Sequence, residues 1–412
     1  MKRIPSLLYS MMLIAATVLP ACAGKPKYPE APRYNQIPPD EIPIVASYAF
    51  YPPFITQQQF EWVKEAGFNV LNKMLDQEEM DSCLALAERN GLYFTVAPWT
   101  IMNLEKLQSV VERYKGNPWV WGYRVADEPT ASDFPKLRAV TSEIERLDPG
   151  QNIFINLFPE MGKKYLGARN YKAYLEEYVK TVNPAFISFD IYPVRQRSDG
   201  SVYVDYGCYN TYETIARVAS ESGRPFWSYV LSNAHGFYPK PEEAYIRFQV
   251  FTSLGYGSQG IAYFTYMAPD FDRGKGDFTD SPIDTEGRRT ATWYMVRNVN
   301  REVRQLSTVF LGAEMIEVAH TGKRIPKGTK RFHKAPAPFV GIESLGEGVM
   351  VSHFRNGARE YLMLVNRDVN DAQKVRLNIS RSVTRIFGDG KERPDTTGVV
   401  TIDRGGYALF RL

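Results

Sequence analysis

The sequence predicts an α/β fold, a (β/α)8 TIM barrel, followed by a C-terminal antiparallel β-sandwich domain. Three observations lead to this prediction. Strand-like and helix-like segments alternate eight times between residues 44 and 306, which is the order expected of a parallel barrel with helices outside. Beyond about Gly312, only short strand-like runs remain. Between residues 119 and 129, an apolar strand-like run ends in two adjacent carboxylates.

The predicted barrel elements rest on periodicity. Strands are short runs rich in β-branched and aromatic residues, and helices carry apolar residues at helical spacing, several with a glycine stop. The predicted strands are Ile44–Phe50, Val70–Met74, Leu92–Trp99, 119–129, Asn152–Phe158, Ala185–Tyr192, Phe226–Ser232 and Ile261–Met267. The predicted helices are Gln57–Gly67, Glu78–Gly91, Leu104–Lys115, Phe134–Leu147, Tyr171–Val182, Tyr212–Ser222, Pro241–Leu254 and Ala291–Leu306.

The remaining chain divides into three further parts. Residues 313–412 contain about seven short strand-like runs separated by Gly, Asn and Asp turns, which predicts the β domain. Residues 1–22 form the signal segment described next, and residues 23–40 are rich in proline and lysine, which predicts an extended tether. The barrel is therefore assigned to residues 41–312, with a basic loop or linker at 323–338 inside the β domain.

The N-terminal segment is similar to a bacterial lipoprotein signal. Lys2 and Arg3 precede an apolar stretch that is too short for a comfortable membrane span, and the sequence LPAC ends at Cys22. The resemblance implies a lipid on Cys22 and a lipid-anchored protein of the cell envelope, touching the membrane only through that anchor. An ordinary secretory signal with a chance cysteine is the alternative. The sequence leaves the membrane face and the oligomeric state open.

Composition excludes several classes of function. The formal net charge is +4 and no basic stripe stands out, so we expect no nucleic-acid partner. Two cysteines, Cys83 and Cys208, and four histidines remain outside the signal, and they show no metal-ligand spacing. We therefore expect no metal site and no cofactor.

The fourth predicted strand, WVWGYRVADEP, carries the strongest functional signal. Side chains alternate along a strand, so the pattern predicts an inward face of Gly122, Arg124, Ala126 and Glu128 and an outward face of Trp121, Tyr123, Val125 and Asp127. An inward carboxylate at a strand end is costly to bury without use. Glu128 is therefore the candidate general acid/base, whereas Asp127 could instead cap the following turn.

Other predicted strand ends supply candidate partners. Asp190 and Tyr192 should point inward on the sixth strand, so Asp190 is either a catalytic carboxylate or the buried partner of Arg124. Arg124 would lower the pKa of a neighbouring carboxylate. The candidates for substrate binding are Arg124, Trp99, Tyr192, Trp227, Asn233 and Tyr266, of which the four aromatic residues could stack on sugar faces. Trp99, Trp227 and Tyr266 could equally be packing residues.

At this point the chain resembles glycoside hydrolases with a (β/α)8 barrel and a C-terminal β domain. In the retaining clan that includes families 5 and 42, the acid/base is a glutamate after the fourth strand, often in Asn-Glu-Pro. Glu128 and Pro129 match that placement, with Asp127 in place of asparagine. That clan's nucleophile is a glutamate after the seventh strand, and FWSYVLSNAHG contains no carboxylate.

A second resemblance accounts for the adjacent pair. Families 20 and 123, which remove N-acetylhexosamines, carry an Asp-Glu pair after the fourth strand. The resemblance implies that the substrate's 2-acetamido oxygen attacks the anomeric carbon, that Asp127 stabilises the resulting intermediate and that Glu128 protonates the leaving oxygen.

The sequence thus predicts a glycoside hydrolase acting on a carbohydrate, with Glu128 as acid/base. Asp127, in the substrate-assisted scheme, or Asp190 is the second carboxylate. If Asp190 is the partner, its carboxyl should lie roughly 5–10 Å from that of Glu128. The alternative class is a non-catalytic glycan-binding lipoprotein built on a hydrolase-like barrel. Sugar, linkage, endo or exo action and stereochemistry stay open.

Overall fold

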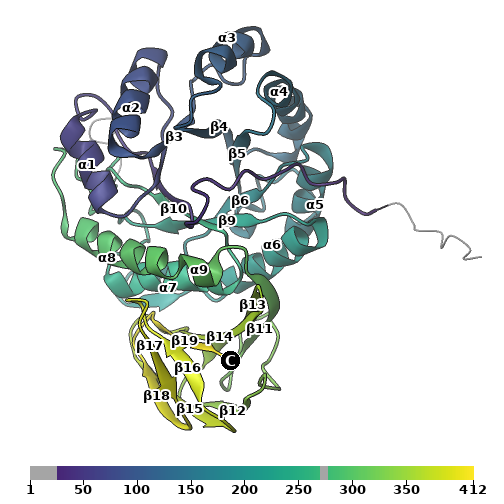
Figure 1. Cartoon of the computed structure of the whole chain (residues 1–412), viewed down its shortest axis with the longest axis vertical. Helices are drawn as coiled ribbons and strands as arrows, with labels where there is room; N and C mark the ends of the chain where they lie inside the picture. Colours follow the sequence, from purple (N-terminus) through teal and green to yellow (C-terminus); the bar gives the residue numbers. More distant parts are fainter. Residues whose placement is uncertain (1–25, 270–276) are drawn as a thin grey trace, which may run out of the picture.

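The computed structural model describes residues 26–269 and 277–412, and its centre is a closed barrel of eight parallel strands (Figure 1). The strands are β1 (Ile44–Ser47), β2 (Val70–Asn72), β3 (Tyr93–Val96), β4 (Val120–Asp127), β5 (Asn152–Leu157), β6 (Ile187–Asp190), β9 (Phe226–Leu231) and β10 (Gly260–Phe264). They follow one another around the barrel in chain order, and β10 closes it by pairing with β1. The predicted fold class is confirmed.

The helices form a ring outside the strands (Figure 1). They are α1 (Gln57–Glu65), α2 (Gln77–Asn90), α3 (Leu104–Tyr114), α4 (Phe134–Leu147), α5 (Tyr171–Thr181), α6 (Cys208–Ser222), α7 (Glu243–Gly255), α8 (Ala291–Gln305) and the short α9 (Ser307–Phe310). Two single 3-10 turns, Ala131–Asp133 and Glu160–Gly162, lie in the loops after β4 and β5.

Local sequence explains where these helices begin and end. In α2, Asp76 accepts a hydrogen bond from the Glu79 backbone N–H while the Glu79 carboxylate accepts one from the Asp76 N–H, a reciprocal cap that satisfies two otherwise unpaired donors. The helix ends at Gly91, whose φ of 61° lies in the left-handed region that glycine adopts without strain. Such caps bring the chain back to the base of the barrel for the next strand.

One insertion was not predicted. A hairpin of β7 (Val194–Gln196) and β8 (Val202–Val204) lies between β6 and α6. Its two strands have three residues each, too short for the alternation of side chains to register in the sequence. Three residues separate the start of the hairpin from the end of β6 at Asp190.

The C-terminal domain is built from two antiparallel sheets, as predicted. One sheet contains β11 (Glu314–His320), β13 (Val349–Asn356), β14 (Arg359–Asn366), β19 (Tyr407–Arg411), β16 (Val383–Ile386) and β17 (Glu392–Asp395), and the other contains β12 (Phe339–Ser344), β15 (Gln373–Ile379) and β18 (Gly398–Ile402). Leu362 and Leu364 from the first sheet share a core with Val375 and Leu377 from the second. In Figure 1 the domain lies beside α7, α8 and α9.

The described part of the predicted tether is packed, which differs from the prediction. Tyr28 is buried, Ile37 accepts a hydrogen bond from Trp121 Nε1 at 3.0 Å, and the backbone of Asn35 exchanges two hydrogen bonds with the Asn152 side chain. The segment crosses one end of the barrel (Figure 1). Aromatic and apolar residues interspersed among the prolines supply this packing, which the proline-rich composition alone conceals.

Cys22, the predicted lipidation site, lies outside the described residues, so the anchor stays a prediction. None of the helices within residues 26–269 and 277–412 is both long and apolar enough to span a bilayer.

Candidate active site

Two β-bulges in β4 decide which side chains face the barrel interior. The pairing register with β3 shifts so that Val120 lies opposite Phe94 and Gly122 opposite Thr95, and the register with β5 shifts between Arg124 and Ala126. Each bulge adds one residue and reverses the alternation beyond it. The predicted faces are therefore wrong for Trp121, Ala126 and Asp127, and Ala126 packs outward beside Val125.

Trp121 points into the closed base of the barrel and Asp127 points into its mouth. Trp121 packs with Phe154 and Trp227. At the first bulge, Gly122 has a φ of 153°, and a Cβ there would lie 2.1 Å from the Asn152 carbonyl oxygen. Only glycine fits this close approach.

Asp127 is held by three donors. Its Oδ2 accepts hydrogen bonds from Arg124 Nη2 at 2.7 Å and from the Tyr48 hydroxyl at 3.2 Å, and its Oδ1 accepts one from Asn156 Nδ2 at 3.2 Å. Arg124 is buried, and Asp127 is its ion-pair partner. The alternative prediction, that Arg124 pairs with Asp190, is wrong. Together the three donors fix the orientation of this carboxylate.

Glu128 stands at the rim of the mouth on strained backbone. Its φ of 46° is left-handed, and its N–H donates to the Asn156 carbonyl at 2.8 Å. Although the residue is exposed on one side, neighbouring atoms remove much of its carboxyl from water. Burial, followed by the charge of Asp127, raises the pKa of Glu128 to about 7 despite an opposing hydrogen bond with Asp190. Such a pKa suits a general acid near neutral pH.

Asp190 ends β6 and is buried against Glu128. Asn156 Nδ2 donates to Asp190 Oδ1 at 3.3 Å, so one amide bridges Asp127 and Asp190. Burial and then the charge of Glu128 hold the pKa of Asp190 well above its ordinary value. The two carboxyls are in hydrogen-bonding contact. This contact brings the two carboxyls closer together than the roughly 5–10 Å predicted for a catalytic pair.

These groups line a pocket of about 280 Å³. Its walls are mostly aromatic, and its polar groups are concentrated on the β4, β5 and β6 side: Tyr48, Asp127, Glu128, Asn156, Asp190, Tyr192, Tyr229, His235, Phe264 and Phe278. The rings of Tyr192 and Phe264 lie nearly parallel with centroids 6.1 Å apart. A concave, apolar site with a few convergent polar groups is typical of small-ligand binding, and the volume suits a single sugar-sized group.

The structure brings only some of the predicted residues to this pocket. Trp227 and Tyr266 are fully buried, the first in the base of the barrel and the second against Phe50 and Phe68. Neither lines the pocket, so the packing interpretation holds for both. Trp99 is 68% exposed and also lies outside the lining.

Asn233 acts behind the pocket rather than in it. It is buried, and its Oδ1 lies 2.6 Å from Nδ1 of His235, which does line the pocket. Burial lowers the pKa of His235, so this ring is neutral near pH 7 and contributes aromatic surface and one ring nitrogen.

Several lining residues were given no role by sequence reasoning. Tyr48, Asn156 and Tyr229 lie in the carboxyl-terminal halves of predicted strands, so position near a strand end was the available signal. Phe264 lies within a predicted strand, and Phe278 lies in a long loop for which the sequence offers no signal. Within the described residues, no group of His, Cys, Asp and Glu is arranged to hold a metal ion.

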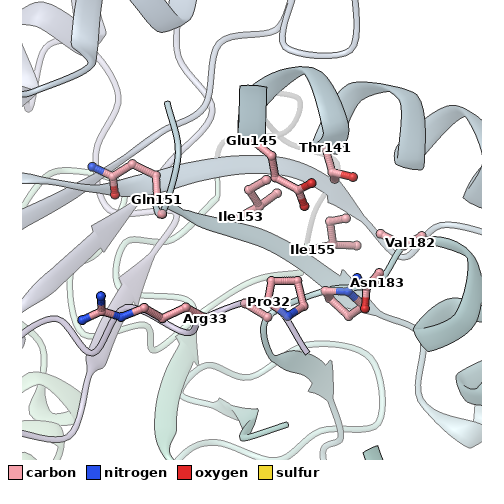
Figure 2. Close-up of a pocket in the computed structure, with 12 residues that line it drawn as sticks. Pro32, Arg33, Thr141, Glu145, Gln151, Ile153, Ile155, Val182 and Asn183 are labelled. Atoms are coloured by element: carbon pink, nitrogen blue, oxygen red, sulfur yellow. The ribbon is translucent and has the colours of Figure 1, made fainter. Parts of the chain in front are cut away.

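A second pocket lies away from the carboxylates (Figure 2). It has a volume of about 190 Å³ between the N-terminal segment, α4, β5 and the start of β6. Figure 2 shows Glu145 and Thr141 of α4 directed toward Ile153 and Ile155, with Pro32 opposite. Glu145 is ion-paired with Arg138 at 3.2 Å. This pocket contains no convergent carboxylates, so the β4–β6 mouth is the candidate active site.

Comparisons with known proteins show the fold. No family model and no curated protein matches the sequence. Among solved structures, an α-amylase from Geobacillus thermoleovorans is similar with a TM-score of 0.51 and 9% identity, over 90% of this chain and 98% of that one. A β-galactosidase from the psychrophilic Marinomonas ef1 gives a TM-score of 0.48 and 10% identity, over 65% of this chain. The match spans about 60% of that β-galactosidase's length. At these identities the shared property is the barrel.

Proposed function

We propose that this protein is a glycoside hydrolase and that Glu128 is its general acid. One observation carries the proposal: Asp127, Glu128 and Asp190 converge on one aromatic-lined pocket at the barrel mouth. A pKa of about 7 keeps a large share of Glu128 protonated near neutral pH, which is the state needed to protonate a departing glycosidic oxygen. Tyr192 and Phe264 offer faces for stacking on the sugar.

The contact between Asp190 and Glu128 favours the substrate-assisted scheme over a nucleophilic Asp190. A retaining pair of carboxyls stands about 5–5.5 Å apart, with the sugar between its members, and no sugar fits between two carboxyls in hydrogen-bonding contact. Asp127 is fixed by Arg124, Tyr48 and Asn156, so it is positioned to stabilise a positive intermediate formed by the substrate's own 2-acetamido oxygen. Asp190 then acts beside Glu128 as a second carboxyl that shares its proton.

The substrate class follows from this assignment. An acetamido-dependent enzyme should hydrolyse aryl N-acetylhexosaminides and should be inhibited by a thiazoline mimic of the cyclic intermediate. Asp127→Asn should reduce kcat/KM about 10²-fold or more. Glu128→Gln should reduce it by about 10²- to 10⁴-fold, and by more for an alkyl leaving group than for 4-nitrophenolate, which departs without a proton.

Glu145→Gln is the matched control, since it neutralises a carboxylate in the other pocket and should leave the rate unchanged. Circular dichroism and thermal unfolding would establish that each variant folds. Suppose that substrates with and without the 2-acetamido group are cleaved equally well and that Asp127→Asn hardly changes kcat/KM. The role of second catalytic carboxylate would then pass from Asp127 to Asp190. If the wild type binds glycans but does not cleave them, the proposal of a hydrolase is wrong and the protein is a glycan-binding protein.

A further inference from the structure

Lys73 follows β2 immediately and stands beside the pocket. Its Nζ lies 5.2 Å from the ring centroid of Tyr48 and 5.9 Å from that of Tyr51. Tyr48 lines the pocket and donates to Asp127 at 3.2 Å. Tyr48 therefore contacts both the Lys73 ammonium and the Asp127 carboxylate, and the cation–π contacts hold the ammonium beside the ring that lines the pocket.

Among the described residues, no carboxylate forms an ion pair with Lys73. Arg124 lies 5.6 Å from the same Tyr48 ring, but its charge is matched by Asp127 at 2.7 Å. Glu79 acts on Lys73 only through longer-range attraction. Partial burial, followed by repulsion from Arg124, lowers the pKa of Lys73 to about 8. A partly desolvated ammonium with a second cation nearby is unfavourable unless an anion joins it.

We propose that Lys73 and Tyr48 form a subsite for an anionic group of the glycan, either the carboxylate of an adjoining uronic acid or a sulfate ester. This inference rests on the proposed function for its ligand class, a glycan, and adds the charge of that glycan. A sugar seated against Tyr48 would bring a substituent or the next ring toward the ammonium. There a charge-assisted hydrogen bond forms in a partly dehydrated place, where it is stronger than in water.

The test measures binding, so that it does not depend on turnover. Calorimetry on Glu128→Gln would compare a hyaluronan tetrasaccharide with the same tetrasaccharide after reduction of its carboxylates to hydroxymethyl groups, and N-acetylglucosamine 6-sulfate with N-acetylglucosamine. Within each pair the acetamido sugar is the same and only the anion differs. We expect about tenfold tighter binding of at least one anionic probe than of its neutral partner, since charged hydrogen bonds are of that strength. If only the first pair shows a difference in affinity, the anionic group is a uronic acid; if only the second pair does, it is a sulfate ester.

Variants locate the effect. Adding Lys73→Met should reduce the preference for the anionic probe about tenfold, and Lys73→Arg should retain much of it because the charge remains. Lys106→Met, which removes an exposed lysine of α3, is the matched control and should leave the preference unchanged. Equal binding of charged and neutral probes, no binding of any of them, or a preference that survives Lys73→Met would overturn the proposal. Anion preference without turnover by the wild type would leave this inference standing and overturn only the hydrolase.

Discussion

At the scale of single residues, the site concentrates unfavourable features at Glu128. The residue combines a φ of 46° with a carboxyl whose pKa is raised to about 7. Non-glycine residues in left-handed backbone carry strain that persists only where the surroundings enforce it, and here the Glu128 N–H bond to Asn156 does so. The left-handed backbone turns the Glu128 side chain away from the strand and toward the pocket, where it contacts Asp190.

This arrangement has a measurable effect on stability. The folded protein holds a proton on Glu128 up to about pH 7, whereas the unfolded chain releases it near the ordinary glutamate value of about 4.3. Between these values the folded state binds more protons, so this group's contribution to stability is lost as the pH rises. Glu128→Gln should therefore be more stable than the wild type at pH 8 and about equal at pH 4.

Urea unfolding at the two pH values measures this difference, and Glu145→Gln should follow the wild type at both. A Glu128→Gln protein that is less stable than the wild type at pH 8 would mean that the carboxylate is favourably solvated or paired in the folded state.

At the scale of elements, β4 shows what sequence patterns can and cannot predict. The sequence indicates the strand itself, its end near Pro129 and the two carboxylates just before that proline, because apolar composition and strand-ending residues are local signals. The two bulges are not, because they depend on pairing with β3 and β5. The failed assignment of faces for Trp121 and Asp127 follows directly, since one added residue reverses each later side chain.

The same distinction explains the candidate site. Glu128, Asp127 and Asp190 were found because carboxylates at strand ends are unusual, and strand ends converge in a barrel. Trp227 and Tyr266 were misplaced because aromatic residues serve cores and sugar subsites alike, and sequence does not reveal how deep a side chain lies. Tyr48 and Phe264 required the packed structure to bring their rings to one wall.

Gly122 provides a test at this scale. Gly122→Ala would place a methyl group against the Asn152 carbonyl at a φ of 153°, so the bulge must move. We expect a loss of unfolding free energy on the order of 2 kcal/mol together with reduced activity, because Arg124 and Asp127 depend on the bulge for their direction.

Gly398→Ala is the matched control, as this strand glycine has open space where a Cβ would lie. Chemical denaturation and kcat/KM would be measured for both variants. An unperturbed Gly122→Ala would show that the bulge is not needed to position the carboxylates.

At the scale of the whole molecule, the barrel is closed at one end and carries the candidate active site at the other. The N-terminal segment packs Tyr34 and Ile37 against the base cluster that contains Trp121 and Trp227. The carboxylates stand at the carboxyl ends of the strands, beyond this cluster. Because the closed end of the barrel is tightly packed, it fixes the directions of the strands. The strands in turn hold the pocket residues at their carboxyl ends in position.

The C-terminal domain is joined to this barrel through a buried histidine. His320, the last residue of β11, packs edge-on against Tyr209 of α6 at 4.8 Å, and its Nε2 lies 3.2 Å from the hydroxyl of Tyr256, which in turn donates to Glu213. Burial, and then the charge of Arg367, lowers the pKa of His320 to about 3. The interface therefore contains a neutral imidazole.

Protonation should loosen this junction in acid. Between about pH 3 and the ordinary histidine value of about 6.5, the unfolded chain binds a proton at His320 that the folded protein excludes, so the free energy of unfolding falls as the pH falls through this window. The slope is about 1.4 kcal/mol per pH unit from this residue.

His320→Gln should reduce this slope of the free energy of unfolding against pH, whereas His333→Gln, which changes an exposed histidine, should leave it unchanged. Urea unfolding from pH 7 to pH 4 measures both slopes, and equal slopes for His320→Gln and the wild type would show that the interface admits the charged imidazole without penalty.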